Sequence, residues 1–246
     1  TDPTDTEDSG WDEPVLKYQR MQADVAKILH SNKTVTKICV YDNFIAVGMS
    51  SGIILVTDFY GNKIRELNCH SGPITDICTD VSGEFLGSSS KDGTVVITNM
   101  QFSTDDMSTS NRNLEGSEGK EERYVYEGTY MLTLCIDPMY KYKKMHLFIT
   151  GGVSGKLILN KKAPFNKKEV ILHEEEGNVI NIAWRKDLVA WANSKRGIKI
   201  MDIEKEEPIT GLAKPKGVVE YKNIKPKCLL YWESDSILLV GWGDTF

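Results

Sequence analysis

The chain has 246 residues, of which 40% are hydrophobic and 26% are charged, a balance typical of a globular protein large enough to bury a core. No run approaches about eighteen apolar residues and the acidic N-terminus does not resemble a secretion signal, so we expect neither a transmembrane helix nor export. The net charge of −5 comes from residues 1–13, which hold six acids and no base; the remaining 29 acids and 30 bases provide no basic field for nucleic acid.

Residues 1–13 are rich in Asp, Thr and Ser. They contain too little apolar surface to offset the entropy lost on ordering, so they are predicted to be a disordered acidic tail. Residues 14–246 are predicted to form one domain. At its start, Pro14–Met21 alternates apolar and polar residues and is predicted to be a strand ahead of the first repeat. In ring-shaped repeat folds such a strand often completes the last repeat, and we hypothesise that role here.

A recurring hairpin organises the rest of the chain. Its clearest copy is Phe85–Asn99, in which Asp92-Gly93 joins two β-rich runs. Asp and Gly tolerate the positive φ angles that a tight turn needs. Three further copies fit the same template, with an apolar residue eight positions before a glycine; the four anchor glycines are Gly52, Gly93, Gly155 and Gly197. Four hairpins on one template predict a repeat protein.

Each hairpin is flanked by two further β-rich runs. Four short strands per unit, at intervals of roughly 40–50 residues, match the period of a β-propeller blade. The first unit runs from about Thr34 to His70, and a fifth begins at Cys228 with its second strand at 237–241; the units between them start near Ile74, Met131 and Val179. The sequence therefore predicts an all-β, WD-like β-propeller, here an incomplete part of about four and a half blades.

The five cysteines are scattered singly, without a Cys-x-x-Cys pair. Cys39, Cys78 and Cys135 stand at equivalent places in apolar repeat runs, so we interpret them as small buried hydrophobic residues in a reducing compartment. Tetrahedral zinc sites need local pairs of ligands, which these cysteines do not form. No metal site and no cofactor are predicted.

Two motifs resemble catalytic chemistry. Gly48-Met-Ser50-Ser-Gly52 matches the Gly-x-Ser-x-Gly nucleophile pattern, but that motif needs a helix after the serine, and here a strand is predicted. His70 precedes Ser71-Gly72-Pro73 at a blade boundary, where we expect a structural histidine that hydrogen-bonds within the repeat. Paired carboxylates and phosphate-cradling loops are absent from the sequence, so the chain is predicted not to be an enzyme.

The second unit is interrupted by Gln101–Glu122, a polar segment rich in Ser, Thr, Asn and acids. Its composition predicts a disordered insertion, which places the fourth strand of this unit at Arg123–Gly128. Within the segment, Ser103 and Thr104 precede two aspartates and would suit an acid-directed kinase. Phosphate there would add up to about two negative charges. An inert insertion is the alternative interpretation.

A second loop is predicted at Asn160–Lys168, between the third and fourth strands of the third unit. It carries Lys161, Lys162, Lys167 and Lys168 around Pro164 and Phe165, while Lys141, Lys143 and Lys144 occupy an adjacent loop of the same unit. Near an anionic membrane each lysine contributes about 1 kcal/mol. The loop is therefore a candidate contact with an anionic membrane or a protein partner; a solvated turn is the alternative.

Several motifs give the chain a specific family resemblance from about residue 14 to residue 246. They are Leu16-Lys-Tyr-Gln-Arg, Gly72-Pro-Ile-Thr, Ile149-Thr-Gly-Gly-Val-Ser-Gly-Lys-Leu-Ile-Leu-Asn and Glu233-Ser-Asp-Ser-Ile-Leu-Leu-Val-Gly-Trp-Gly. With these motifs the chain resembles the N-terminal propeller of the family of vacuolar protein sorting subunits forty-one, which belong to the HOPS tethering complex.

The resemblance implies a non-enzymatic interaction domain in protein transport, acting in vesicle docking and fusion. It implies a cytoplasmic protein, peripheral on vacuole or lysosome and late-endosome membranes. Implied partners are other HOPS subunits, a late-endosomal Rab-family GTPase and a subunit of adaptor complex three. Some fungal members carry an amphipathic lipid-packing sensor; the loop at 160–168 lacks its long apolar face. The alternative function is another WD-like adaptor, either a coat component or a ubiquitin-ligase substrate receptor.

Overall fold

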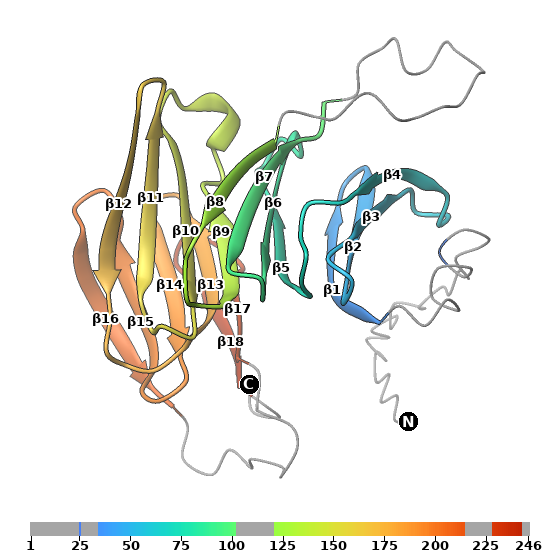
Figure 1. Ribbon diagram of the computed structural model, residues 1–246. Helices are drawn as coiled ribbons and strands as arrows, with labels where there is room; N and C mark the ends of the chain where they lie inside the picture. Colours follow the sequence, from blue (N-terminus) through green and yellow to red (C-terminus); the bar gives the residue numbers. More distant parts are fainter. Residues whose placement is uncertain (1–24, 26–33, 102–120, 215–227, 243–246) are drawn as a thin grey trace, which may run out of the picture.

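The computed structural model describes residues 25, 34–101, 121–214 and 228–242, and these form four sheets of four strands and one of two strands (Figure 1). Blade one contains β1 (Val35–Tyr41), β2 (Phe44–Met49), β3 (Ile54–Thr57) and β4 (Lys63–Leu67). Blade two contains β5 (Ile74–Thr79), β6 (Phe85–Ser90), β7 (Thr94–Asn99) and β8 (Glu121–Val125). Blade three contains β9 (Met131–Ile136), β10 (His146–Gly152), β11 (Leu157–Ala163) and β12 (Asn166–His173). Blade four contains β13 (Val179–Arg185), β14 (Leu188–Asn193), β15 (Gly197–Asp202) and β16 (Glu207–Ala213), and the last unit contains β17 (Cys228–Trp232) and β18 (Leu238–Trp242).

Every blade is an antiparallel meander in which consecutive strands pair, so the predicted repeat and its count of about four and a half blades are confirmed. The blades follow one another as a fan in Figure 1, from blue to red. The first strand of each blade packs on the first strand of the next, in the order β1, β5, β9, β13, β17. The result is an open arc of a propeller, built from the described residues.

The core lies between the blades. In β7, Val96 belongs to the cluster shared with blade one, whereas Val95 and Ile97 belong to the cluster shared with blade three. Successive side chains of a strand point to opposite faces, and here both faces are covered. This is why the strand appears in the sequence as a continuous apolar run.

The three equivalent cysteines lie in these interfaces. Cys39, Cys78 and Cys135 each pack, partly buried, against the apolar cluster between one blade and the next. Burial raises the pKa of the Cys39 thiol to about 11 and that of Cys135 to about 12, so both thiols stay protonated at neutral pH. Their predicted role as packing residues is confirmed.

Three of the anchor glycines, Gly52, Gly93 and Gly155, lie in the turns between the second and third strands, and the fourth, Gly197, is the first residue of the third strand. Gly52 has a φ of +86°, and a Cβ atom there would lie 2.2 Å from the carbonyl oxygen of His70 at the blade boundary. Only glycine fits both the left-handed backbone and this close approach. The other three anchors share the positive φ, with values of 83°, 75° and 132° for Gly93, Gly155 and Gly197.

One predicted boundary was wrong. The fourth strand of blade two is Glu121–Val125 rather than 123–128, because Glu121 and Glu122 pair with Thr98 and Ile97 and continue the antiparallel ladder. The predicted acidic tail, the Pro14–Met21 strand and most of the inserted segment, with Ser103 and Thr104, lie outside the described residues. They stay predictions.

Candidate functional site

The lysine-rich segment of blade three is a β-hairpin, which corrects the predicted loop. β11 and β12 pair to their ends, with Lys162 opposite Lys167, Lys161 opposite Lys168 and a two-residue turn of Pro164 and Phe165. Like charges directly opposite in a sheet repel each other, which is why the sequence pattern favoured a loop. The hairpin forms because residues from neighbouring blades compensate the lysines.

Three of the four lysines have partners outside their own blade. Lys162 pairs with Glu122 on β8, and the Nζ of Lys161 lies 2.8 Å from Glu206 in the turn between β15 and β16. The Nζ of Lys167 lies 4.4 Å from the ring centre of Tyr124 on β8. Contacts to blade two and blade four therefore fix the direction of the hairpin.

The hairpin ends in an apolar side chain. Phe165 at the turn has a relative exposure of 102%, so none of its ring is shielded by the rest of the chain. Moving such a ring out of water is favourable by about 1.5–3 kcal/mol. An exposed aromatic residue between two pairs of lysines can insert into an apolar environment while the cations meet an anionic surface.

The second lysine segment lies at the same end of blade three. It contains the short 3₁₀-helical turn η2 (Tyr140–Tyr142) and leads into β10, where His146 pairs with Lys162 of the hairpin. Figure 1 shows η2 and the tip of the β11–β12 hairpin at the top of the molecule. The predicted proximity of the two lysine segments is thus confirmed. We call residues 139–145 and 161–168 together the blade-three tip.

The blade-three tip also exposes apolar residues that the sequence analysis did not single out. Tyr142 has 61% of its surface exposed, Met145 48% and Met139 43%. The signal was present, because these residues are interspersed with Lys141, Lys143 and Lys144 in the sequence. The tip therefore combines exposed apolar groups with lysines in both of its segments.

Two of the lysines in the second segment have counter-ions. Lys141 pairs with Glu84, and the Nζ of Lys143 lies 2.8 Å from Asp137. The hydrogen bond from Lys141 lowers the pKa of the Glu84 carboxyl, so this acid is ionised at neutral pH. Burial, helped by the charge of Lys162, lowers the pKa of His146, so His146 adds no positive charge there.

The two catalytic-looking motifs have structural roles. Ser50 lies in the turn between β2 and β3, where its N–H donates to the carbonyl oxygen of Thr34 at 2.8 Å. A strand follows, as predicted. The ring of His70 contacts the hydroxyls of Thr94 and Ser88 at 2.7 and 2.8 Å. Its predicted structural role is confirmed, but both partners lie on β6 and β7 of blade two and not in the first unit, to which the sequence assigned His70.

The described part of the chain contains neither a cluster of metal ligands nor a membrane-spanning helix. Within it, no three residues among His, Cys, Asp and Glu are grouped so that they could ligate a metal ion. Nor does any described helix have the length and apolar character needed to cross a bilayer.

Comparison with known proteins places these features in a family. The model of the Vps41 β-propeller family, described as "Vps42 beta-propeller", matches residues 16–246. The chain is 35% identical over 234 residues to a vacuolar protein sorting-associated protein 41 homolog of Arabidopsis thaliana, and this match covers 95% of the chain and 22% of the relative. The homolog of Homo sapiens is 30% identical over 234 residues, covering 95% and 25%, and the Saccharomyces cerevisiae protein is 23% identical over 250 residues, covering 94% and 23%.

The chain thus spans about a quarter of the length of these curated relatives. Among solved structures, a chain of the crystal structure of a mitotic checkpoint complex aligns with a TM-score of 0.58. The two are 12% identical, and the alignment covers 85% of this chain and 61% of the other. At that identity the likeness concerns the fold alone.

Proposed function

The chain belongs to the Vps41 β-propeller family, and from this premise we propose that it is the propeller end of a HOPS tethering subunit. Its relatives are named for vacuolar protein sorting. In this role the propeller is a non-enzymatic scaffold in vesicle docking and fusion at the vacuole or lysosome and the late endosome. The observation that carries the proposal is the family match over residues 16–246.

The proposed mechanism is presentation of binding surfaces on a rigid frame. Blades that share apolar interfaces hold their connecting loops in fixed positions, so several modest contacts add up. The proposed partners are other HOPS subunits, a late-endosomal Rab-family GTPase and a subunit of adaptor complex three. We place the protein in the cytoplasm, peripheral on these membranes.

Affinity purification of the full-length protein from cells, followed by mass spectrometry, tests this role. We expect the other tethering subunits and a late-endosomal GTPase to be recovered. Recovery of coat or ubiquitin-ligase components in their place would contradict the tethering role and favour another WD-like adaptor.

Within this function we propose that the blade-three tip contacts an anionic membrane. The support is local: Phe165 is fully exposed at the end of the hairpin, and Lys167 and Lys168 follow it closely in sequence. Tyr142 and Met145 are exposed at the same end of the blade. Apolar groups that enter the interface and lysines that meet anionic headgroups are the two terms of peripheral binding.

Replacing Phe165 by Ser and both Lys167 and Lys168 by Gln is expected to weaken vesicle binding at least tenfold. Each lysine contributes about 1 kcal/mol near an anionic surface, and the ring adds its own burial. The measurement is co-sedimentation of the full-length protein with phosphatidylcholine vesicles containing phosphatidylserine, at low and at moderate salt.

The matched control replaces Lys91 and Lys195 by Gln, because both lie in turns between second and third strands rather than at the blade-three tip. The control should bind as the unmodified protein does. Equal binding by the tip variant and the control, or binding that is insensitive to salt, would contradict the membrane contact.

A further inference from the structure

The outer strand of blade four differs from the fourth strands of blades one to three. The unpaired edge of a sheet invites pairing with another chain, and proteins protect it with charged side chains. β4, β8 and β12 each carry three charged residues, whereas β16 (Glu-Pro-Ile-Thr-Gly-Leu-Ala) carries Glu207 and Pro208 at its start and no charge after them. All seven residues of β16 are exposed, including Ile209 at 55% and Leu212 at 51%. Among the described residues, residues 209–213 of β16 thus have neither a paired strand on their outer side nor a charged side chain.

The direction of the backbone groups of β16 follows from its register. The N–H of Lys214 donates to the carbonyl oxygen of Arg196 at 3.2 Å, and Leu212 pairs with Ile198 two residues earlier. Hydrogen-bonded positions alternate along an antiparallel strand, so Leu212 bonds towards β15. Gly211 and Ala213 therefore direct their N–H and C=O groups outwards, to the open edge.

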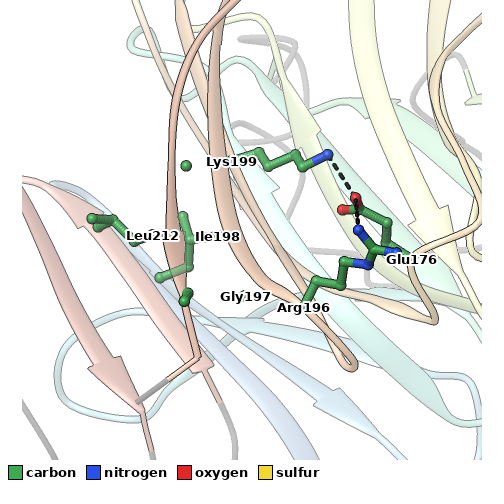
Figure 2. Close-up of a pocket in the computed structure, with 8 residues that line it drawn as sticks. Glu176, Arg196, Gly197, Ile198, Lys199 and Leu212 are labelled. Atoms are coloured by element: carbon green, nitrogen blue, oxygen red, sulfur yellow. Dashed lines mark hydrogen bonds and ion pairs between the residues drawn. The ribbon is translucent and has the colours of Figure 1, made fainter. Parts of the chain in front are cut away.

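A pocket of about 280 Å³ lies beside this edge. Gly211, Leu212 and Ala213 of β16 line it together with residues 196–199 and Glu176. Figure 2 shows Ile198 and Leu212 on one side and the cluster of Arg196, Lys199 and Glu176 on the other. The edge is thus continuous with a pocket that offers both apolar and charged groups.

The charged side of the pocket has more cations than anions. The carboxylate of Glu176 lies 2.8 Å from the Nζ of Lys199 and 3.8 Å from a guanidinium nitrogen of Arg196. The same carboxylate also lies 3.0 Å from the Nε2 of His173. One carboxylate thus pairs with two cations. Because 74% of the Arg196 side chain is exposed, a second carboxylate from outside the chain can also pair with these cations.

We propose that the outer edge of β16 binds an extended segment of another protein, which adds as a fifth strand to blade four. The outward groups of Gly211 and Ala213 provide the backbone bonds, and Ile209 and Leu212 favour alternating apolar side chains. The segment carries an acidic residue at the end that lies beside Arg196 and Lys199. This inference goes beyond the tethering role and does not depend on it.

A peptide segment fits this site better than a second copy of the chain. An edge of about six residues buries far less than the roughly 1,200 Å² that a stable interface needs between two folded proteins. An extended segment requires only the edge, and its acidic side chain gains the pocket as well. The cations at one end of the edge also set the direction of the bound segment. A segment that pairs antiparallel to β16 has its N-terminus, with the acidic residues, beside Ala213.

The test is fluorescence anisotropy of the full-length protein with a labelled peptide, Asp-Glu-Val-Thr-Val-Thr-Val. Its matched control is Lys-Lys-Val-Thr-Val-Thr-Val. We expect the acidic peptide to bind at least tenfold more tightly than the basic one. Gly211→Pro removes an outward N–H without removing a hydrogen bond to β15. We therefore expect this variant to bind the acidic peptide at least tenfold more weakly than the unmodified protein does.

If Gly211→Pro does not fold, a second variant still tests the proposal. R196Q combined with K199Q leaves the backbone edge intact, and it should bring the two peptides to similar affinity. Lys195→Gln, next to the pocket but not lining it, should leave the preference unchanged. Equal binding of both peptides, or light scattering that shows a dimer formed through this edge in place of peptide binding, would overturn the proposal.

Discussion

Replacing Asp76 by alanine is expected to lower the free energy of unfolding by about 3 kcal/mol, because this carboxylate joins three blades. One oxygen accepts hydrogen bonds from the Thr133 hydroxyl at 2.8 Å and from the Leu134 N–H at 3.0 Å, both on β9. The other lies 2.7 Å from the Nζ of Lys37 on β1. Asp76 itself, on β5, is 7% exposed.

The substitution would leave the Lys37 ammonium and three donors, on Ile77, Thr133 and Leu134, without their acceptor. Burial alone would lower the pKa of Lys37, but Asp76 outweighs it and raises that pKa, so the ammonium form of Lys37 depends on Asp76 for its stabilisation in the folded chain. Unfolding of the 246-residue chain in urea, followed by tryptophan fluorescence, measures the effect.

Two variants serve as comparisons. Asp76→Asn keeps an oxygen for β9 but loses the charge, so we expect an intermediate loss. Asp58→Ala removes an exposed carboxylate that accepts three hydrogen bonds within one turn, and we expect a clearly smaller loss than at Asp76. A loss at Asp76 no larger than at Asp58 would contradict the view that Asp76 joins the blades.

The stability of the chain is expected to fall by about 2 kcal/mol between pH 7.5 and pH 5.0 through His70 alone. Burial lowers the pKa of His70 to about 4, despite the carboxylate of Asp92 at 3.6 Å. In the unfolded chain the pKa is about 6.5. Between these two pKa values the unfolded state therefore binds a proton that the folded state does not bind. The stability present above pH 6.5 is lost progressively as the pH falls to about 4.

Asp92 does not contribute in this range. Burial would raise its pKa, but hydrogen bonds from Thr94 and from the N–H of Ser71 lower it, so the carboxyl stays ionised above pH 4. In urea unfolding, the free energy of unfolding of His70→Asn should change less between pH 7.5 and pH 5.0 than that of the original chain, whatever its value at pH 7.5. His146→Gln is the matched control and should retain most of the change. Equal pH dependence of the original chain and His70→Asn would show that His70 is not its cause.

Local pattern in the sequence determined the repeat. A glycine with positive φ eight residues after an apolar residue specifies one tight hairpin, and four copies specify the blades without knowledge of any contact. Continuous apolar runs such as Val95–Ile97 identified strands that are covered on both faces. The sequence also placed both lysine segments in one blade, because both lie within the same repeat.

Only the tertiary structure decided where pairing continues and where it is open. Lys161 and Lys162 extend a hairpin because Glu206 and Glu122 lie on other blades, which the pattern around the lysines cannot show. The three-blade role of Asp76 likewise depends on residues far away in the chain. The open edge at residues 209–213 of β16 could not be predicted for the same reason: the residue pattern of a strand is local, but its neighbours are set by long-range packing.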